Sequence, residues 1–174
     1  NAHIQILKIS RIIGDQRSVE RKIKSMLVDE KFKNIKGDLE LELAQLYIDQ
    51  NDVDNSVVRL ESIVNDYQRT ETSAEAYFLL GQLYLSELWN PNIAKEKFTQ
   101  VKKEYNRTEY GPFCDSKIKA IDKYIDALAS LKKYDVKLDT LSNDSIKLDS
   151  TKIVDEMPKK PIQELLYLIG DIEA

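Results

Sequence analysis

An internal repeat constrains the fold of this 174-residue chain more than any other feature of its sequence. The block Ala44-Gln45-Leu46-Tyr47 recurs as Gly81-Gln82-Leu83-Tyr84, 37 positions later. The block Asp66-Tyr67-Gln68-Arg69-Thr70-Glu71 recurs as Glu104-Tyr105-Asn106-Arg107-Thr108-Glu109, 38 positions later. A period of this length is typical of stacked helix pairs, because each pair can bury its apolar face only against its neighbours.

The apolar residues inside the repeat follow helical periodicity. Leu39, Leu43 and Leu46 lie three to four positions apart, and Leu41 and Ile48 form a second apolar edge. A helix with two apolar edges needs neighbours on two sides.

Small and large residues also alternate between successive predicted helices. Ala44 and Gly81 stand on the first helix of each unit, and Leu60 and Phe98 stand on the second. A small residue allows close approach, and the larger side chain fills the space beside it.

These residues resemble a known family. Tyr77-x-x-Leu80-Gly81-x-x-Tyr84 followed by Ala94-x-x-x-Phe98 is similar to the tetratricopeptide repeat (TPR) signature, with an aromatic in place of its tryptophan and one extra residue in the turn. The resemblance implies an all-α, right-handed solenoid of antiparallel helix pairs. It implies about three repeats plus a capping or degenerate helix, a long loop and the first helix of another repeat.

The expected organisation follows from how well each segment keeps the pattern. Residues 1–36 keep its apolar spacing and a turn at Gly14-Asp15, and Leu166-x-x-Ile169-Gly170 restarts it near the end. From residue 135 the composition shifts to Asp, Ser, Thr and Lys. We therefore predict a divergent repeat at 1–36, repeats at 37–73 and 74–110, a degenerate repeat or capping helix at 111–134, a polar linker or long loop at 135–160, and the first helix of a truncated repeat at 161–174.

Residues with catalytic or metal-binding chemistry are scarce. His3 is the single histidine and Cys114 the single cysteine, so neither a His/Cys zinc site nor an internal disulfide is expected. Cys114 is interpreted as a core residue, and the carboxylates Glu40 and Glu42 as parts of solvated helix faces. The sequence contains no phosphate-binding loop or nucleophile elbow. We predict no catalytic, cofactor-binding or metal-binding residues, and hence no enzymatic activity.

The charge distribution bears on possible partners. Residues 1–36 carry nine Lys/Arg against four Asp/Glu, whereas residues 37–75 carry two against ten. Phe32 is the only Phe, Trp or Tyr among residues 1–46, so the basic stretch lacks the aromatic platforms of single-strand nucleic-acid binders. No apolar run approaches the roughly 18 residues of a membrane span. We therefore expect neither nucleic-acid binding nor direct membrane insertion.

The resemblance implies a scaffold that binds a protein or peptide in a concave groove lined by the first helix of each pair. Carried over position by position, the groove residues are Leu41, Gln45, Ile48, Asp49, Phe78, Gln82, Leu85 and Ser86, with Lys8 and Arg11 at the corresponding places of the first unit. The apolar members are expected to be exposed as anchors for an extended or helical peptide. The Lys and Asn clamp for a terminal carboxylate is not present, which disfavours an acidic C-terminal tail as the ligand.

A structural role is the alternative. The chain also looks like bacterial periplasmic or outer-membrane-associated repeat proteins, and by this analogy it would be a spacer or assembly subunit of a bacterial cell-envelope complex. The analogy favours the periplasm or cell envelope over the cytoplasm. An exposed apolar groove would favour the peptide binder, and a polar concave face would favour the spacer.

Overall fold

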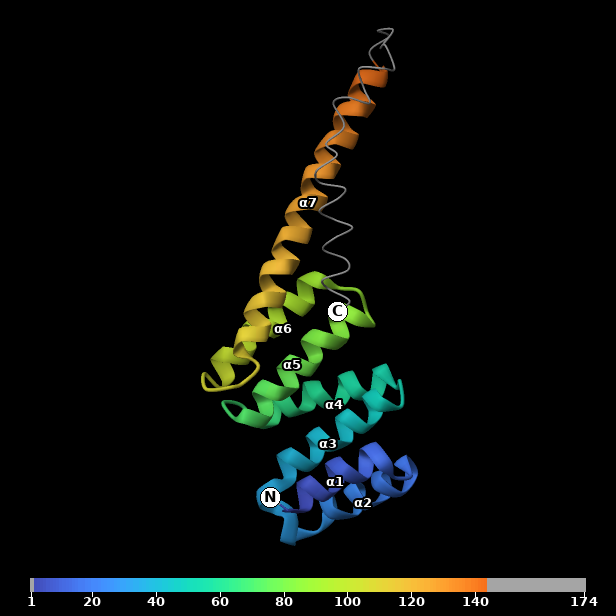
Figure 1. Ribbon diagram of the computed structural model, residues 1–174, viewed down its shortest axis with the longest axis vertical. Helices are drawn as coiled ribbons and strands as arrows, with labels where there is room; N and C mark the ends of the chain where they lie inside the picture. Colours follow the sequence, from blue (N-terminus) through green and yellow to red (C-terminus); the bar gives the residue numbers. More distant parts are fainter. Residues whose placement is uncertain (1, 144–174) are drawn as a thin grey trace. The chain divides into compact units, whose positions relative to one another are not determined.

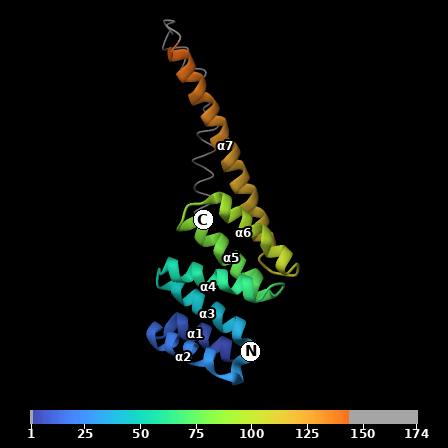
Figure 2. The same cartoon turned by 180° about the vertical axis from the view of Figure 1, so that it is seen from behind.

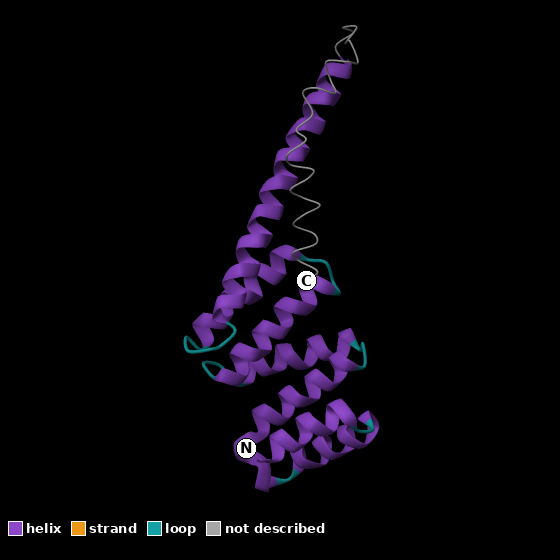
Figure 3. Cartoon of the chain, viewed as in Figure 1, coloured by secondary structure: helices purple, strands orange, loops and turns teal. Residues whose placement is uncertain are grey.

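Helices joined by short loops form the part of the chain that its computed structural model describes, which is the backbone of residues 2–143 and the side chains of residues 2–133 (Figure 3). The elements in order are α1 (Ala2–Ile13), α2 (Gln16–Val28), the 3-10 helix η1 (Glu30–Ile35), α3 (Lys36–Asp49), α4 (Val53–Asp66), α5 (Glu71–Ser86), α6 (Pro91–Glu104) and α7 (Gly111–Asn143). No strand occurs among these residues, so the predicted all-α class is confirmed. The chain divides into two compact units, residues 1–115 and 116–174, and the packing described below is that of the first.

The helices begin where polar side chains can cap them. Asp15, Asp52, Thr70 and Asn90 each accept a hydrogen bond from a backbone N–H in the first turn of the helix that follows, at 3.1–3.2 Å. These bonds satisfy donors that have no partner inside the helix. Pro91 then occupies the first turn of α6, where a missing N–H costs nothing.

Helices of the first unit contact one another in chain order. α2 packs on α1 and α3, α4 packs on α3 and α5, and α6 packs on α5. Two views from opposite sides show the same succession of α1–α2, α3–α4 and α5–α6 (Figures 1 and 2). α3 also contacts both α1 and α5, so the first helices of successive pairs lie close together.

α3 takes part in two hydrophobic clusters, which explains its two apolar edges. The first cluster joins α1, α2 and α3 through Ile4, Leu7, Val19, Ile23, Met26, Leu39, Leu43 and Leu46. The second joins α3, α4 and α5 through Leu41, Ala44, Leu60, Ile63, Val64, Ala76, Leu80 and Leu83. The pairs α1–α2 and α3–α4 thus each pack against the first helix of the pair that follows.

The predicted small-to-large contact is present between α5 and α6. A Cβ atom built on Gly81 would lie 2.5 Å from the Phe98 ring, so only glycine fits at this position. The Phe98 side chain is 1% exposed. The ring therefore packs directly on the backbone of α5.

The last described helix is longer than the sequence predicted. We expected a helix over 111–134 and a linker from 135, but α7 continues to Asn143, so the predicted boundary is wrong. The shift to polar residues was misleading, because Leu131, Leu138 and Leu141 keep the heptad-like spacing and no Gly or Pro interrupts it. Residues 144–160 of the predicted linker and the predicted helix at 161–174 lie outside the described residues.

Replacing Phe98 by alanine tests the packing of α6 on α5. We expect Phe98→Ala to lower the free energy of unfolding by about 3–5 kcal/mol, because a fully buried ring is removed from a packed interface. Urea denaturation measures the change. Val58→Ala, at a 70% exposed position of α4, is the control and should stay within about 0.5 kcal/mol. A loss below about 1 kcal/mol for Phe98→Ala would show that the ring is not buried.

Adding one methyl group at Gly81 tests the same contact from the other side. We expect Gly81→Ala to cost about 1–3 kcal/mol, because the new Cβ overlaps the Phe98 ring and overpacking outweighs the gain in helix propensity. Phe98→Leu shortens the opposing side chain, so Gly81→Ala should cost less in that background. Thermal and urea unfolding of the two single variants and the double variant give the coupling energy. If the effects of Gly81→Ala and Phe98→Leu on the free energy of unfolding are additive, residue 81 does not contact the Phe98 ring.

Candidate functional site

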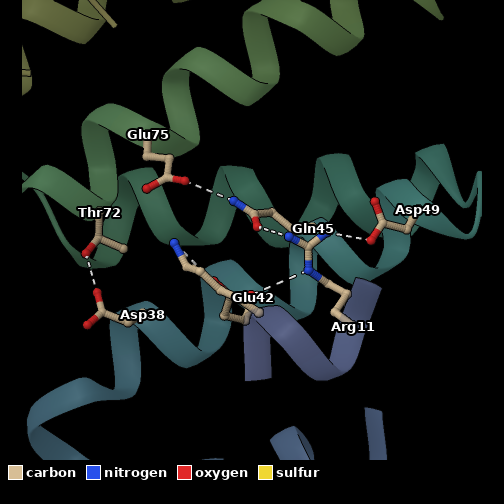
Figure 4. A network of polar contacts seen from close by, with 8 residues as sticks. Arg11, Asp38, Glu42, Gln45, Asp49, Thr72 and Glu75 are labelled. Carbon is tan, nitrogen blue, oxygen red and sulfur yellow. Dashed lines mark hydrogen bonds and ion pairs between the residues drawn. The ribbon is translucent and has the colours of Figure 1, made fainter. Parts of the chain in front are cut away.

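A row of polar side chains crosses α1, α3 and α5 on the face predicted to form the groove. Figure 4 shows these side chains pointing toward one another across the three helices. Arg11 comes from α1, Glu42, Gln45 and Asp49 from α3, and Glu75 from α5. We refer to this set, together with Lys8 of α1, as the polar network.

Arg11 is the centre of the network. Its Nη2 donates to Oε1 of Gln45 at 2.8 Å, and its Nη1 donates to Oδ2 of Asp49. Its Nε lies 3.5 Å from Oε2 of Glu42. The Arg11 side chain is 15% exposed, so these contacts form largely out of water. One side chain of α1 therefore holds three side chains of α3.

Glu42 is buried although it is charged. Its side chain is 1% exposed, with Lys8 Nζ at 3.6 Å on one oxygen and Arg11 on the other. Burial raises the pKa of Glu42 because the charged form loses its hydration, and the positive charges of Lys8 and Arg11 oppose that rise. Neither Arg11 Nε nor Glu42 Oε2 meets the geometry of a hydrogen bond, so their attraction is Coulombic.

The network continues from α3 to α5. Gln45 Nε2 donates to Oε1 of Glu75 at 2.9 Å, and Tyr110 forms a hydrogen bond with the same carboxylate. Burial raises the pKa of Glu75, and burial beside Glu75 raises the pKa of Tyr110. A second bridge from α3 to α5 is the 2.9 Å bond that Thr72 donates to Asp38. The amide of Gln45 thus bonds at once to a side chain of the preceding helix pair and to one of the following pair.

Three apolar residues that were expected to line an open groove, Leu41, Ile48 and Leu85, are buried or half-buried. Leu41 and Leu85 are each 4% exposed, so the expectation that they line an open groove is wrong. Leu41 belongs to the cluster of α3, α4 and α5, and the half-buried Ile48 packs against the same cluster. Leu41 and Ile48 hold helices together because α3 has packing neighbours on both of its apolar edges.

The Phe78 ring packs against other aromatic rings of the chain. Its ring stacks on Tyr110 with centroids 4.4 Å apart, and it meets Phe113 edge to face at 5.4 Å and Phe98 at 6.3 Å. The half-buried ring therefore joins α5 to α6 and to the segment that enters α7.

The polar candidates fall into two groups. Gln45 and Asp49, and the first-unit positions Lys8 and Arg11, are brought together in the polar network. Gln82 and Ser86 are exposed on α5, where Ser86 donates to the Gln82 carbonyl at 3.0 Å as part of the helix.

Sequence reasoning missed the buried Glu42 and the half-buried Glu75 of this face. Glu42 was interpreted as part of a solvated face, and Glu75 and Tyr110 were not selected as site residues. The available signal was the position of Glu42 between Leu41 and Leu43, which places a charge on a helix that is apolar on both edges. Such a charge needs buried partners, and Lys8 and Arg11 lie one repeat earlier.

The arrangement offers packing and charge rather than reactive groups. Cys114 is 1% exposed, as expected for a core residue, and burial raises its thiol pKa to about 11, the opposite of an activated nucleophile. His3 is exposed and meets Phe32 edge to face at 5.3 Å. Within residues 2–143, no group of three or more His, Cys, Asp or Glu is placed to hold a metal ion.

None of the described helices combines the length with the hydrophobicity that crossing a membrane would require. Comparison of the chain with protein-family models, with curated proteins and with solved structures finds no match. The likeness to tetratricopeptide repeats therefore rests on the residues of this chain.

Removing Arg11 tests the network. We expect Arg11→Ala to lower the free energy of unfolding by about 2–4 kcal/mol, because it leaves the buried carboxylate of Glu42 with Lys8 as its remaining positive neighbour. Arg17→Ala, which removes an exposed arginine of α2, is the matched control and should have little effect. Chemical denaturation at neutral pH measures both. Equal effects would show that Glu42 does not depend on Arg11.

The pH dependence of stability tests the raised pKa of Glu75. A carboxyl with a raised pKa in the folded state contributes stability that is fully present below its unfolded pKa and is lost as pH rises through the folded pKa. Glu75→Gln removes this loss while its amide oxygen can still accept from Gln45. The variant should therefore gain stability relative to the wild type as pH rises from about 4 toward neutrality.

Urea unfolding across this range measures the difference, and Glu96→Gln, at an exposed position of α6, controls for the loss of one charge. A difference that does not change with pH would contradict the prediction.

Proposed function

We propose that this chain is a non-enzymatic structural module, a TPR-like right-handed array that serves as a spacer or assembly subunit for partner proteins. The pairs α1–α2, α3–α4 and α5–α6 are its repeats. The observation that carries the proposal is that the side chains of the α1, α3 and α5 face bond to one another, while the apolar candidates for a groove are buried.

The energetics of the polar network support a structural role for this face. A ligand that recruited Arg11 would have to replace its bonds to Gln45 and Asp49 and to compensate the buried charge of Glu42. Leaving a buried charge without its partner is strongly unfavourable. The network is therefore better suited to fixing the register of the helices than to receiving a peptide.

The packing of α3 supports stiffness along the array. Its side chains belong to both hydrophobic clusters, so bending between the first and second pairs would disturb the cluster that holds the second pair to the third. A solenoid gains rigidity from such nearest-neighbour interfaces.

Binding of a basic peptide on the same face is a second candidate, favoured by charge. Residues 37–75 carry ten Asp/Glu against two Lys/Arg, and Gln82 and Ser86 remain exposed on α5. A lysine-rich segment would complement this surface, and its binding would weaken as salt screens the charges.

Distance measurement between spin labels tests the structural role. The labels are attached to cysteines introduced by Val28→Cys and Thr99→Cys, at exposed positions on α2 and α6. Both substitutions are made in a Cys114→Ala background, which removes the native thiol. The distance between the two labels then reports the separation of α2 from α6. A spacer predicts one narrow distance distribution that a lysine-rich peptide leaves unchanged, and Arg11→Ala should broaden it. A broad or multi-peaked wild-type distribution would overturn the spacer. A shift that the peptide produces at low salt and that high salt abolishes would establish the second candidate instead.

A further inference from the structure

The side-chain amide of Gln45 has one orientation that satisfies both of its neighbours. Its Oε1 accepts from Nη2 of Arg11 at 2.8 Å, and its Nε2 donates to Oε1 of Glu75 at 2.9 Å (Figure 4). A guanidinium can only donate hydrogen bonds, and a carboxylate can only accept them. A half-turn of the amide would set donor against donor at α1 and acceptor against acceptor at α5. The amide is therefore a two-state element whose state Arg11 and Glu75 select together.

Glu75 carries the connection beyond α5. Its carboxylate also accepts a hydrogen bond from the hydroxyl of Tyr110, which lies in the turn between α6 and α7. Burial beside Glu75 raises the pKa of Tyr110, so the hydroxyl keeps the proton that it donates. The Tyr110 ring stacks on Phe78 of α5 with centroids 4.4 Å apart. The ring contact and the hydrogen bond together hold the turn of residues 105–110 on α5, and we call the docked ring the Tyr110 latch.

The next repeat shows that this bridge is particular to Gln45. At the offset of 37 residues, Gln82 of α5 stands at the same place as Gln45 of α3, but Gln82 is exposed. The bridge therefore arises from Arg11 and Glu75 on the flanking helices, and the repeat position alone does not produce it. Gln82 also supplies a control with the same side chain on the same face.

We propose that the Gln45 amide couples the hold of Arg11 on α3 to the docking of the Tyr110 latch on α5. While Arg11 fixes the amide, its N–H faces Glu75 and keeps the carboxylate where Tyr110 can donate to it. Without Arg11, Glu75 alone orients the amide, so the carboxylate loses a preorganised donor and the latch opens more often. The device goes beyond the proposed spacer, because a change at the first helix pair loosens the segment that enters α7.

Hydrogen–deuterium exchange of residues 105–115 in the full chain measures how often the latch opens. Within this segment, the backbone N–H of Tyr110 donates to the Thr108 hydroxyl, and that of Cys114 donates to the Tyr110 carbonyl. These amides exchange when the segment opens, so their rates report the population of the open state.

We expect Arg11→Met and Gln45→Met each to speed this exchange at least about fivefold, the lower end of typical coupling between sites. The double variant should exchange no faster than Gln45→Met alone, because the amide that carries the coupling is already absent. Gln82→Met, the matched control, should leave the rates unchanged. Gln45→Met keeps both positive neighbours of Glu42, so it tests the coupling even if Arg11→Met does not fold.

Three outcomes would overturn the proposal. Unchanged exchange in Gln45→Met would show that the latch does not depend on the amide. A further acceleration by Arg11→Met in the Gln45→Met background would place its effect at the buried Glu42 instead. An equal effect of Gln82→Met would show a general loss of stability. Each of these results leaves the wild-type spin-label distances unaffected, so the coupling can fail while the spacer stands, and the reverse.

Discussion

The direct packing of a large side chain on a small one is the constraint on which the rest of the array depends. Phe98 fits against α5 because residue 81 has no Cβ, and the preceding pair repeats the arrangement with Leu60 and Ala44 in one cluster. This contact sets how closely the two helices of a pair approach. It thereby fixes where the apolar edge of the pair meets the next helix, so that α3 can complete one cluster and begin another.

The polar network follows from that spacing. Arg11 reaches α3, and Gln45 reaches α5, because the first helices of successive pairs lie side by side. A buried ion pair such as Glu42 with Arg11 adds little stability relative to apolar packing, but it strongly penalises any register that separates its members. Apolar packing therefore holds the pairs together, and a change of register that separated Arg11 from Glu42 would leave a buried charge without one of its partners.

Much of the architecture could be predicted from the sequence because it depends on spacing. The repeat located the helices, and the pairing of Gly81 with Phe98 is the contact that its small and large residues indicated. The groove could not be predicted in the same way. A helical pattern shows that Leu41 and Leu85 are apolar, but it does not show whether a second seam of the stack covers them, and both are buried. The burial of Glu42 depends on Lys8 and Arg11, which the period separates from it by a whole repeat.

The apolar edges of α3 and α5 differ from that of α1 in whether a neighbouring helix covers them. Along the sides, each apolar edge of α3 and α5 has a neighbouring helix, and the polar residues between them bond across the helices. In α1, the register that buries Leu43 and Leu80 leaves Ile6 half exposed. Among the described residues, the apolar edges of α3 thus face neighbouring helices on both sides, whereas this edge of α1 faces solvent.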